Sequence, residues 1–436
     1  MFIAVVIAAS LFGSASRTNA QNPVEINFYW SSAVAGDLPK IFQGYADTFN
    51  KANSDVKVNL VYGGGYADTL KKIQTEVSGG GTSADVAILL STDVYTLVDN
   101  DYVISLNDLI KNTKAGDAYI KDFFPAFMRN SIAYGETYGI PFQRSTPVLY
   151  YNKDMFKAAG LDPVAPKTWQ DMEAAAKKLT NPGNVWGIEI PSDGFPYWLF
   201  QGFAISNGQN VVGDASNKVF FNTPSTVEGL QFFADLANKD KVMPSGVIKW
   251  GDTPTDFEAG KVAMIYHTTG SLTSILSKSK FDVGVGFLPA GKKGYGAPTG
   301  GGNLYILKSA PADHQAAAWK WIQFLSSPEI QADWTVQTGY IAARQSSWET
   351  KTLKDLVAAK PQYGVARDQL QYSDKELTSH QGADVQKILG QAVQAAITGQ
   401  KTPQQALDEA QKNAEALLSQ YPDEAAAATP AATKAQ

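Results

Sequence analysis

Residues 141–154, with the sequence Pro-Phe-Gln-Arg-Ser-Thr-Pro-Val-Leu-Tyr-Tyr-Asn-Lys-Asp, constrain the fold of this chain more than any other segment. A short apolar strand ends here in a polar cluster, after which Pro147 fixes one backbone dihedral angle. A second apolar strand, Val148 to Tyr151, follows at once and leads into a helix at Asp154. Two strands joined through such a kink predict a place where the chain crosses between two lobes.

The rest of the chain is long enough for two lobes and alternates between strand and helix patterns. Its 436 residues exceed what one hydrophobic core usually fills. Apolar residues alternate over 56–62, as in a half-buried strand, and repeat at helical spacing over 66–77. After the crossing, strand candidates lie at 187–190, 262–266 and 283–287. This alternation predicts the α/β class, with one α/β lobe on each side of the crossing.

Two further segments are predicted to cross between the lobes. Glycine is concentrated at residues 296–302, just before a strand candidate at 304–307. Glycine lets the backbone bend and approach a ligand closely, so we expect the second crossing there. The turn Thr338-Gly339-Tyr340 marks a third crossing.

The N-terminal residues carry the pattern of an export signal. Phe2 to Phe12 form an apolar run too short to span a bilayer, and Thr18-Asn19-Ala20 offers a small-residue cleavage site. No Lys or Arg precedes the apolar run, which departs from the usual pattern. We expect residues 1–20 to be a signal peptide that directs the protein to the periplasm. The composition of residues 422–436 predicts a disordered tail.

The composition and the motifs exclude several classes of function. A net charge of −5 disfavours nucleic acid as a partner, because a phosphate backbone requires a basic face. The chain has no cysteine, so it forms no disulfide and offers no thiolate to a metal. Its three histidines have no metal-ligand spacing, and no Gly-x-Ser-x-Gly or Gly-Lys-Ser/Thr motif occurs. We therefore expect no catalytic residues, no metal and no cofactor.

The segment PF…STPVLYYNKDMFKAAGLDP, residues 141–163, resembles the first interlobe crossover of the extracellular solute-binding proteins of ABC importers, family 1. The similarity is greatest to the glycerol-3-phosphate-binding periplasmic proteins and is also strong at 401–408 and 260–264. It implies the two-lobed periplasmic-binding-protein fold, whose lobes are discontinuous in sequence. The crossings then place lobe 1 at 24–144 with about 303–335, and lobe 2 at 148–299 with about 341–421.

The resemblance also implies a function. The protein would bind glycerol-3-phosphate or a glycerophosphodiester between its lobes and deliver it, as a monomer, to an inner-membrane permease with its ATPase subunits. One alternative ligand class is a neutral mono- or oligosaccharide. Two alternatives outside transport remain: a secreted carbohydrate-active enzyme, and a sensory receptor domain that presents a ligand to a membrane kinase.

Five positions match ligand-binding positions of the glycerol-3-phosphate binders. They comprise two tyrosines, two hydroxyl residues and one backbone donor: Tyr66, Tyr340, Ser145, Thr268 (where the family has a serine) and Gly301. Aromatic planes offer apolar contact to sugar rings and can hold a choline-type cation. Large aromatics near loops are therefore further candidates, although core packing is an equal alternative for each of them: Trp30, Tyr197, Trp198 and Trp250.

Two positions depart from the pattern of these relatives. The family glutamate that would hold glycerol hydroxyls is replaced by Thr92, with Asp93 beside it. The family arginine for the phosphate aligns with Gln386, and a glutamine has no charge to replace it. Arg144 lies in the first crossover, so we hypothesise that it has taken over anion recognition, with Lys387 as a second candidate. The alternative is that Arg144 braces the hinge through a salt bridge.

Overall fold

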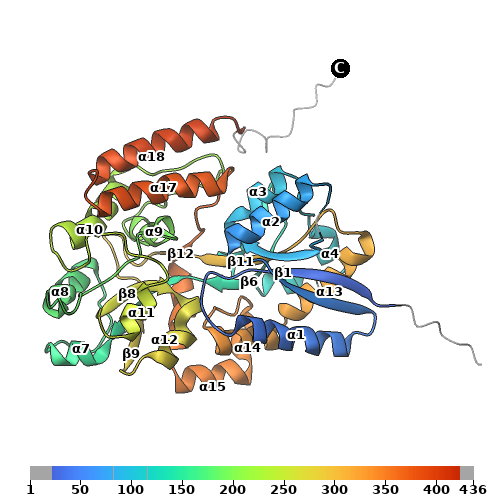
Figure 1. The fold of residues 1–436 in the computed structure, drawn as a ribbon, viewed down its shortest axis with the longest axis horizontal. Helices are drawn as coiled ribbons and strands as arrows, with labels where there is room; N and C mark the ends of the chain where they lie inside the picture. Colours follow the sequence, from blue (N-terminus) through green and yellow to red (C-terminus); the bar gives the residue numbers. More distant parts are fainter. Residues whose placement is uncertain (1–21, 82, 115, 423–436) are drawn as a thin grey trace, which may run out of the picture.

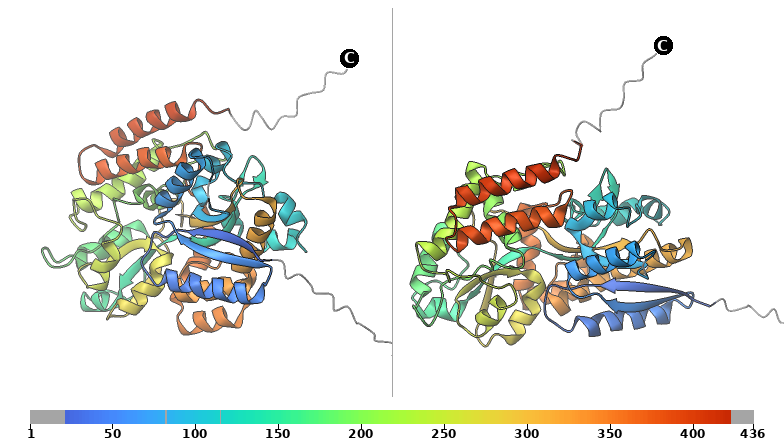
Figure 2. Two further views of the ribbon diagram at one scale, coloured as in Figure 1. Left: turned by 45° about the vertical axis from the view of Figure 1, so that its right-hand side comes forward. Right: turned by 45° about the horizontal axis from the view of Figure 1, so that its top comes forward.

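The computed structural model describes residues 22–81, 83–114 and 116–422, so the predicted signal peptide and nearly all of the predicted tail lie outside the described residues. The chain forms two α/β lobes that lie side by side, and β6 (Ile140–Ser145) and β11 (Gly300–Ile306) of the first lobe lie where the two meet (Figure 1). Figure 2 shows the same two groups of elements from two other directions, with α17 (Gly382–Ile397) and α18 (Pro403–Leu418) stacked along the outside of one lobe.

The first lobe is built on a five-stranded sheet in the order β2-β1-β3-β11-β6. β1 pairs in parallel with both β2 and β3, whereas β11 runs antiparallel to β3 and β6. Its strands are β1 (Val24–Trp30), β2 (Val56–Tyr62), β3 (Val86–Leu90), β6 (Ile140–Ser145) and β11 (Gly300–Ile306). β11 joins this sheet only after the chain has passed through the second lobe, which makes the first lobe discontinuous.

The second lobe contains a three-stranded antiparallel sheet in the order β8-β7-β9. Its strands are β7 (Pro147–Asn152), β8 (Met264–Thr268) and β9 (Val283–Gly286). The strand predicted at 187–190 is wrong. Trp186 and Glu189 make only isolated bridges, to Val262 and Ile265. No continuous ladder forms, because the N–H groups of Gly187 and Ile188 between them donate to the Val242 carbonyl instead.

The helices cover the sheets, and several begin at the residues that the sequence indicates. Thr168 caps α8 in a capping box with Asp171, and Thr223 and Thr402 cap helices that start with proline. The longer helices of the first lobe are α1 (Leu38–Ala52), α2 (Tyr66–Ser78), α13 (Ala312–Leu325) and α14 (Pro328–Thr338). α15 (Lys351–Ala359) and α16 (Gln362–Gln369) lie at the junction, where α15 packs on α14 and α16 on β9. Those of the second are α7 (Lys153–Ala158), α8 (Trp169–Leu179), α9 (Pro196–Ser206), α10 (Pro224–Asn238), α11 (Thr253–Glu258) and α12 (Leu272–Lys278), with α17 and α18.

Shorter elements lie in the connections between these layers. They are α3 (Val94–Asp99), α4 (Asn107–Lys111), α5 (Gly116–Lys121), α6 (Pro125–Met128), β4 (Ile132–Ala133), β5 (Glu136–Thr137), β10 (Ala297–Pro298), β12 (Ser373–Asp374), η1 (Ser91–Asp93), η2 (Thr269–Ser271), η3 (Gln345–Glu349) and η4 (Leu370–Tyr372). β10 pairs with β12 in a small parallel sheet of its own.

The first crossing lies where the sequence predicts it. β6 ends at Ser145 in the five-stranded sheet, and β7 begins at Pro147 in the three-stranded sheet, so Thr146 alone joins them. The Gln369 amide holds this joint by donating hydrogen bonds to the Thr146 hydroxyl (3.0 Å) and the Pro147 carbonyl (2.8 Å). At the third crossing, the Ile341 N–H donates to the Arg144 carbonyl (2.8 Å). The crossings therefore lie against one another.

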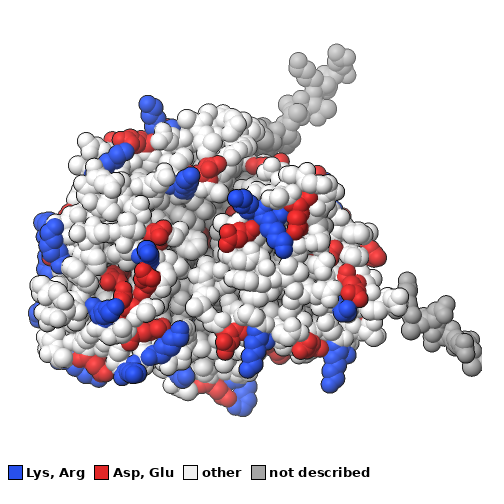
Figure 3. Space-filling model, in the orientation of Figure 1, with Lys and Arg blue, Asp and Glu red and all other residues white. Residues whose placement is uncertain are grey.

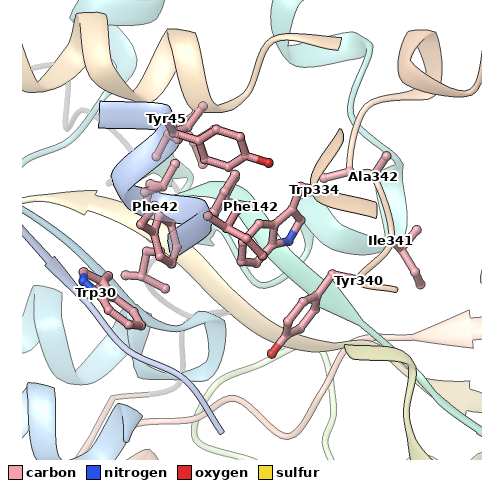
Figure 4. Packing of buried hydrophobic residues seen from close by; sticks show 14 of the residues in the cluster. Trp30, Phe42, Tyr45, Phe142, Trp334, Tyr340, Ile341 and Ala342 are labelled. Atoms are coloured by element: carbon pink, nitrogen blue, oxygen red, sulfur yellow. The ribbon is translucent and has the colours of Figure 1, made fainter. Parts of the chain in front are cut away.

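Large aromatic side chains fill the core of the first lobe. Phe42 packs against Trp30, Phe142 and Trp334, and Trp334 is stacked on Tyr340, with ring centroids 5.6 Å apart (Figure 4). The same buried cluster continues through residues of both sheets around the first crossing. The lobes therefore share packed side chains at their junction, while a separate cluster forms the interior of the second lobe.

The surface shows no concentrated positive charge on the face in Figure 3, where lysines and arginines lie among aspartates and glutamates. Among the described residues, no helix combines the length and the apolar character that crossing a membrane requires. Within the same residues, no group of three or more histidine, aspartate or glutamate side chains is placed to hold a metal ion.

Candidate functional site

A cavity with about 350 Å³ of empty space lies between the two sheets, at the point where the crossings meet. We call it the central cavity. Only about 30 Å³ of this space admits a water-sized molecule, far below the roughly 300–1,000 Å³ of small-molecule sites, so the lobes must move apart before a ligand can enter. Residues of both lobes and of the crossings line it: Ala33, Val34, Tyr66, Leu90, Ser145, Phe195, Trp198, Trp250, Thr268, Gly301, Tyr340 and Glu376.

Aromatic side chains form much of the wall, and hydrogen bonds and ring contacts fix their orientation. Tyr66 is the first residue of α2, and its hydroxyl donates to Gln143 Oε1 at 2.7 Å. The Trp198 indole donates to the Thr299 carbonyl at 2.7 Å. Burial raises the pKa of Tyr340 to about 12, so this residue presents a neutral hydroxyl. The walls are therefore ordered before a ligand binds, which lowers the entropic cost of binding.

Polar groups from the crossings lie between these rings. Thr268 ends β8, and its hydroxyl accepts a hydrogen bond from the Gly270 N–H at 3.1 Å. Gly301 has φ +93°, and a Cβ atom there would lie 1.8 Å from the Gln143 carbonyl oxygen. Only glycine fits such an approach, and it leaves the backbone next to the cavity uncovered by a side chain. Ser145 ends β6, opposite Gly300 in the strand register.

Trp250 closes one side of the central cavity and connects the lobes directly. Its indole N–H donates to the Ala33 carbonyl at 3.0 Å, and its ring lies 4.0 Å from the His267 ring, centroid to centroid. Ala33 follows β1 of the first lobe, whereas Trp250 precedes α11 of the second. The two lobes therefore meet across the mouth of the cavity, as expected for a closed form.

Glu376 is a cavity residue that the sequence analysis missed. It lies in the connection between β12 and α17 and is 2% exposed. Asn130 holds its backbone: the Glu376 N–H donates to Asn130 Oδ1 (3.3 Å), and Asn130 Nδ2 donates to the Glu376 carbonyl (3.2 Å). The side-chain Oε1 accepts from the Tyr197 hydroxyl (3.3 Å). No motif or periodicity marks this connection, so only the folded chain reveals the residue.

A second, more open space adjoins the central cavity. We call it the outer chamber; about 390 Å³ of it admits a water-sized molecule, and it shares Leu90 and Phe195 with the central cavity. Three predicted site residues line it: Asp93, Tyr197 and Gln386. The Gln386 amide donates to the Leu377 carbonyl at 3.0 Å, so part of its hydrogen-bonding capacity is already used.

Two predicted site residues, Arg144 and Thr92, line neither space. Arg144 is fully buried; its Nη1 donates to Asn303 Oδ1 at 3.1 Å, and its guanidinium lies 4.9 Å from the centroid of the Phe127 ring. Burial lowers the pKa of Arg144 to about 10, although the negative charge of Glu376 acts to raise it. Thr92 is fully buried in η1, and its hydroxyl has no partner among the described residues.

Of the eleven predicted positions, six therefore converge on the central cavity: Tyr66, Ser145, Trp198, Thr268, Gly301 and Tyr340. Of the other two aromatic candidates, Trp250 also lines the cavity, whereas Trp30 belongs to the core of the first lobe. The remaining lining residues, Ala33, Val34, Leu90 and Phe195, carry no signal in the sequence that distinguishes them from core residues.

A comparison with models of protein families identifies the family in which this two-lobed architecture is found. The model for bacterial extracellular solute-binding proteins matches residues 44–361. The chain belongs to this family. Its members bind solutes, so the expectation of a binding protein rather than an enzyme is confirmed. The predicted two-lobed α/β fold is confirmed as well, by the solved structures described next.

Relatives and solved structures with the same fold differ in their ligands. The sn-glycerol-3-phosphate-binding periplasmic protein UgpB of Pectobacterium atrosepticum is 29% identical over 437 residues, which cover 95% of this chain and 96% of the relative. UgpB from Mycobacterium tuberculosis in complex with glycerophosphocholine superposes with a TM-score of 0.80 at 22% identity, covering 92% of this chain and 99% of that one. T. maritima MalE3 bound to maltose gives 0.79 at 23% identity, with 90% and 100% coverage.

Buried carboxyl groups predict a pH-dependent stability. Burial raises the pKa of Glu376 to about 8, and those of Asp93 and Glu189 to about 7. Between pH 6.5 and 8 the native state therefore binds more protons than the unfolded state, so the free energy of unfolding falls as the pH rises. We expect a loss of about 2–3 kcal/mol across this range, at about 1.4 kcal/mol per pH unit for each fully protonated group.

The measurement is urea unfolding of the ligand-free protein at pH 6.5 and pH 8. His267 acts in the opposite direction, because burial lowers its pKa to about 4 while the unfolded imidazole still takes up protons near pH 6.5; most of its effect lies below this range, and the remainder offsets a small part of the loss. Glu376→Gln should remove about half of the loss, since this residue has the highest pKa of the three. A stability that is constant or rises with pH in this range would contradict the prediction.

Proposed function

We propose that this protein binds glycerol-3-phosphate or a glycerophosphodiester in the central cavity and delivers it to an ABC permease. The observation that carries the proposal is the convergence of Tyr66, Ser145, Thr268, Gly301 and Tyr340 on one cavity between the lobes. These residues come from distant parts of the sequence, and each matches a ligand position of the glycerol-3-phosphate binders. The curated relatives that are similar over nearly the whole chain are named for the same ligand.

Transport by this class of protein depends on closure of the lobes around the ligand. We propose lobe 1 at 24–144 with about 303–335 and lobe 2 at 148–299 with about 341–421 as the moving bodies, joined by the three crossings. A ligand that contacts both lobes favours the closed form, and a permease with its ATPase subunits then distinguishes the closed from the open protein. The protein acts as a monomer in the periplasm, after removal of residues 1–20.

A neutral sugar is the second candidate ligand, and the composition of the cavity wall favours it. Five aromatic rings line the central cavity, and no lysine or arginine does so among the described residues. Aromatic faces suit the C–H surfaces of sugar rings, whereas a buried phosphate dianion requires charge-assisted donors. Solved structures with this fold include a maltose complex.

The test is calorimetry of the purified protein with glycerol-3-phosphate, glycerophosphocholine and maltose, accompanied by small-angle scattering. We expect at least one of the two phosphate compounds to bind and to reduce the radius of gyration. The same compound should raise the free energy of unfolding by about 2.7 kcal/mol at a concentration 100 times its Kd. Binding of maltose alone would replace the organophosphate proposal with the sugar proposal, and no binding at all would contradict both.

A further inference from the structure

Glu376 has an open hydrogen-bonding position at the wall of the central cavity. Its Oε2 atom is buried and has no partner among the described residues, whereas its Oε1 atom accepts from Tyr197. An unpartnered buried carboxyl oxygen costs free energy, because it has lost its hydration without gaining a donor. Since Glu376 lines the cavity, a bound molecule is in a position to supply that donor.

We propose that Glu376 is a ligand-binding residue that accepts hydrogen bonds from the hydroxyl groups of the ligand's glycerol or other polyol part. This inference rests on the proposed function and deepens it, because it names the part of the ligand that the residue recognises. It also assigns a specificity: Glu376 favours ligands that present vicinal hydroxyls to it and disfavours a phosphate group in the same place.

The chemistry of the surrounding residues selects hydroxyls over the other groups of such ligands. Above its pKa of about 8, Glu376 is ionised, and a phosphate beside it would bring two anionic groups together in a buried site, at a large electrostatic cost. A quaternary ammonium carries no N–H and therefore leaves the open oxygen without a hydrogen bond. A hydroxyl donates to that oxygen directly, while the C–H groups of the same polyol can lie against Trp198 and Tyr340, which line the same cavity.

Arg144 supports this role from behind the cavity wall. Its buried charge favours the ionised form of Glu376, and Nε and Nη2 of its guanidinium have no partner among the described residues. The Asp93 carboxyl acts in the opposite direction, because it raises the pKa of Glu376. A carboxylate that faces a nearby cation on one side and ligand hydroxyls on the other is stabilised from both sides.

The experiment measures binding by calorimetry at pH 9, where Glu376 with its pKa of about 8 is ionised. It uses three probes: glycerophosphocholine, phosphocholine, which lacks the glycerol part, and maltose. We expect Glu376→Gln to weaken glycerophosphocholine binding by about 10–100-fold, the range for a lost hydrogen bond to a charged group. Weak binding of phosphocholine should be unchanged. Glu189→Gln is the matched control, because Glu189 is also a buried carboxylate with a raised pKa but does not line the cavity, so it should leave all affinities unchanged.

The outcomes separate this inference from the proposed function. If the wild type binds glycerophosphocholine and Glu376→Gln binds it within twofold, the role of Glu376 is overturned and the proposed function stands. An equal loss for phosphocholine assigns Glu376 to the cationic head group and also overturns the inference. If the wild type binds only maltose, the organophosphate function fails, and a 10-fold or greater loss of maltose binding in Glu376→Gln retains the hydroxyl-binding role.

A wild type that binds no probe overturns both proposals. The melting temperature of each variant is measured without ligand, because a purely structural role would lower stability along with affinity. Should Glu376→Gln fail to fold, Glu376→Asp provides the second variant: it keeps the charge but shortens the side chain, and we expect the same selective loss of glycerophosphocholine.

Discussion

Replacement of Gly301 by alanine is expected to lower the free energy of unfolding by about 4 kcal/mol, which is at the upper end for single substitutions. The new Cβ atom would lie 1.8 Å from the carbonyl oxygen of Gln143, which belongs to the neighbouring strand β6. Backbone on both strands must then move, because neither the φ of +93° nor the oxygen position tolerates a side chain. The movement would separate β6 from β11 at the second crossing.

Gly183→Ala provides the matched control for this prediction. Gly183 has a similar φ of +83°, but a Cβ atom there would meet nothing within 4 Å. Its substitution should cost about 1–2 kcal/mol, the penalty for a left-handed backbone alone. Urea unfolding of the two variants isolates the clash. If both variants lose the same stability, the close approach of the strands at Gly301 is not as tight as the structure indicates.

The sequence could predict the crossings because they depend on local chemistry. Pro147 fixes a dihedral at the joint between β6 and β7, and glycine at 301 permits a backbone approach that no other residue allows. The first residues of several helices could be predicted for the same reason, because the capping residues are neighbours in sequence, as in the capping box of Thr168 and Asp171. The segment 187–190 has the apolar pattern of a strand, but its pairing depends on neighbours distant in sequence, and those neighbours provide only isolated bridges.

The residues of the binding site also fall into two groups: those that a local sequence motif predicts and those that depend on contacts with distant residues. Tyr66 and Tyr340 could be predicted because each stands in a short motif that matches the family. Glu376 stands in no such motif, and its position at the cavity depends on Asn130, a residue 246 positions earlier that bonds to its backbone. The place of Arg144 in the crossover predicts that it faces the ligand, but its side chain lies in the interior, beside Phe127 and Asn303, which no local sequence signal indicates.

Replacement of Arg144 by alanine is expected to lower the free energy of unfolding by about 3–5 kcal/mol. Arg144 is among the largest fully buried side chains, so its truncation leaves a cavity at the junction of the lobes and removes the donor to Asn303. Arg129→Ala is the control: Arg129 also forms an ion pair, with Asp374, but its side chain is 55% exposed. Exposed pairs contribute about 0–1 kcal/mol, so this variant should remain close to the wild type.

A third variant, Arg144→Met, separates the volume of the side chain from its charge. Methionine fills much of the space, and at pH 6 Glu376 is protonated in the native state because burial raises its pKa to about 8. Loss of the Arg144 charge then leaves no unpaired anion, so Arg144→Met should recover most of the stability that alanine loses. At pH 9 the wild type holds an ionised Glu376 beside a cation, whereas the methionine variant must keep this carboxyl protonated or bury its charge alone.

The stability difference between wild type and Arg144→Met should therefore increase from pH 6 to pH 9, as measured by urea unfolding of the ligand-free proteins. The same increase should be absent when Glu376→Gln is the background, because no carboxyl then remains for Arg144 to balance. A difference that is independent of pH would show that Arg144 braces the junction by packing alone. A large loss of phosphate-ligand affinity without loss of stability would instead support its role in anion recognition, which requires the guanidinium to turn from the interior towards the cavity.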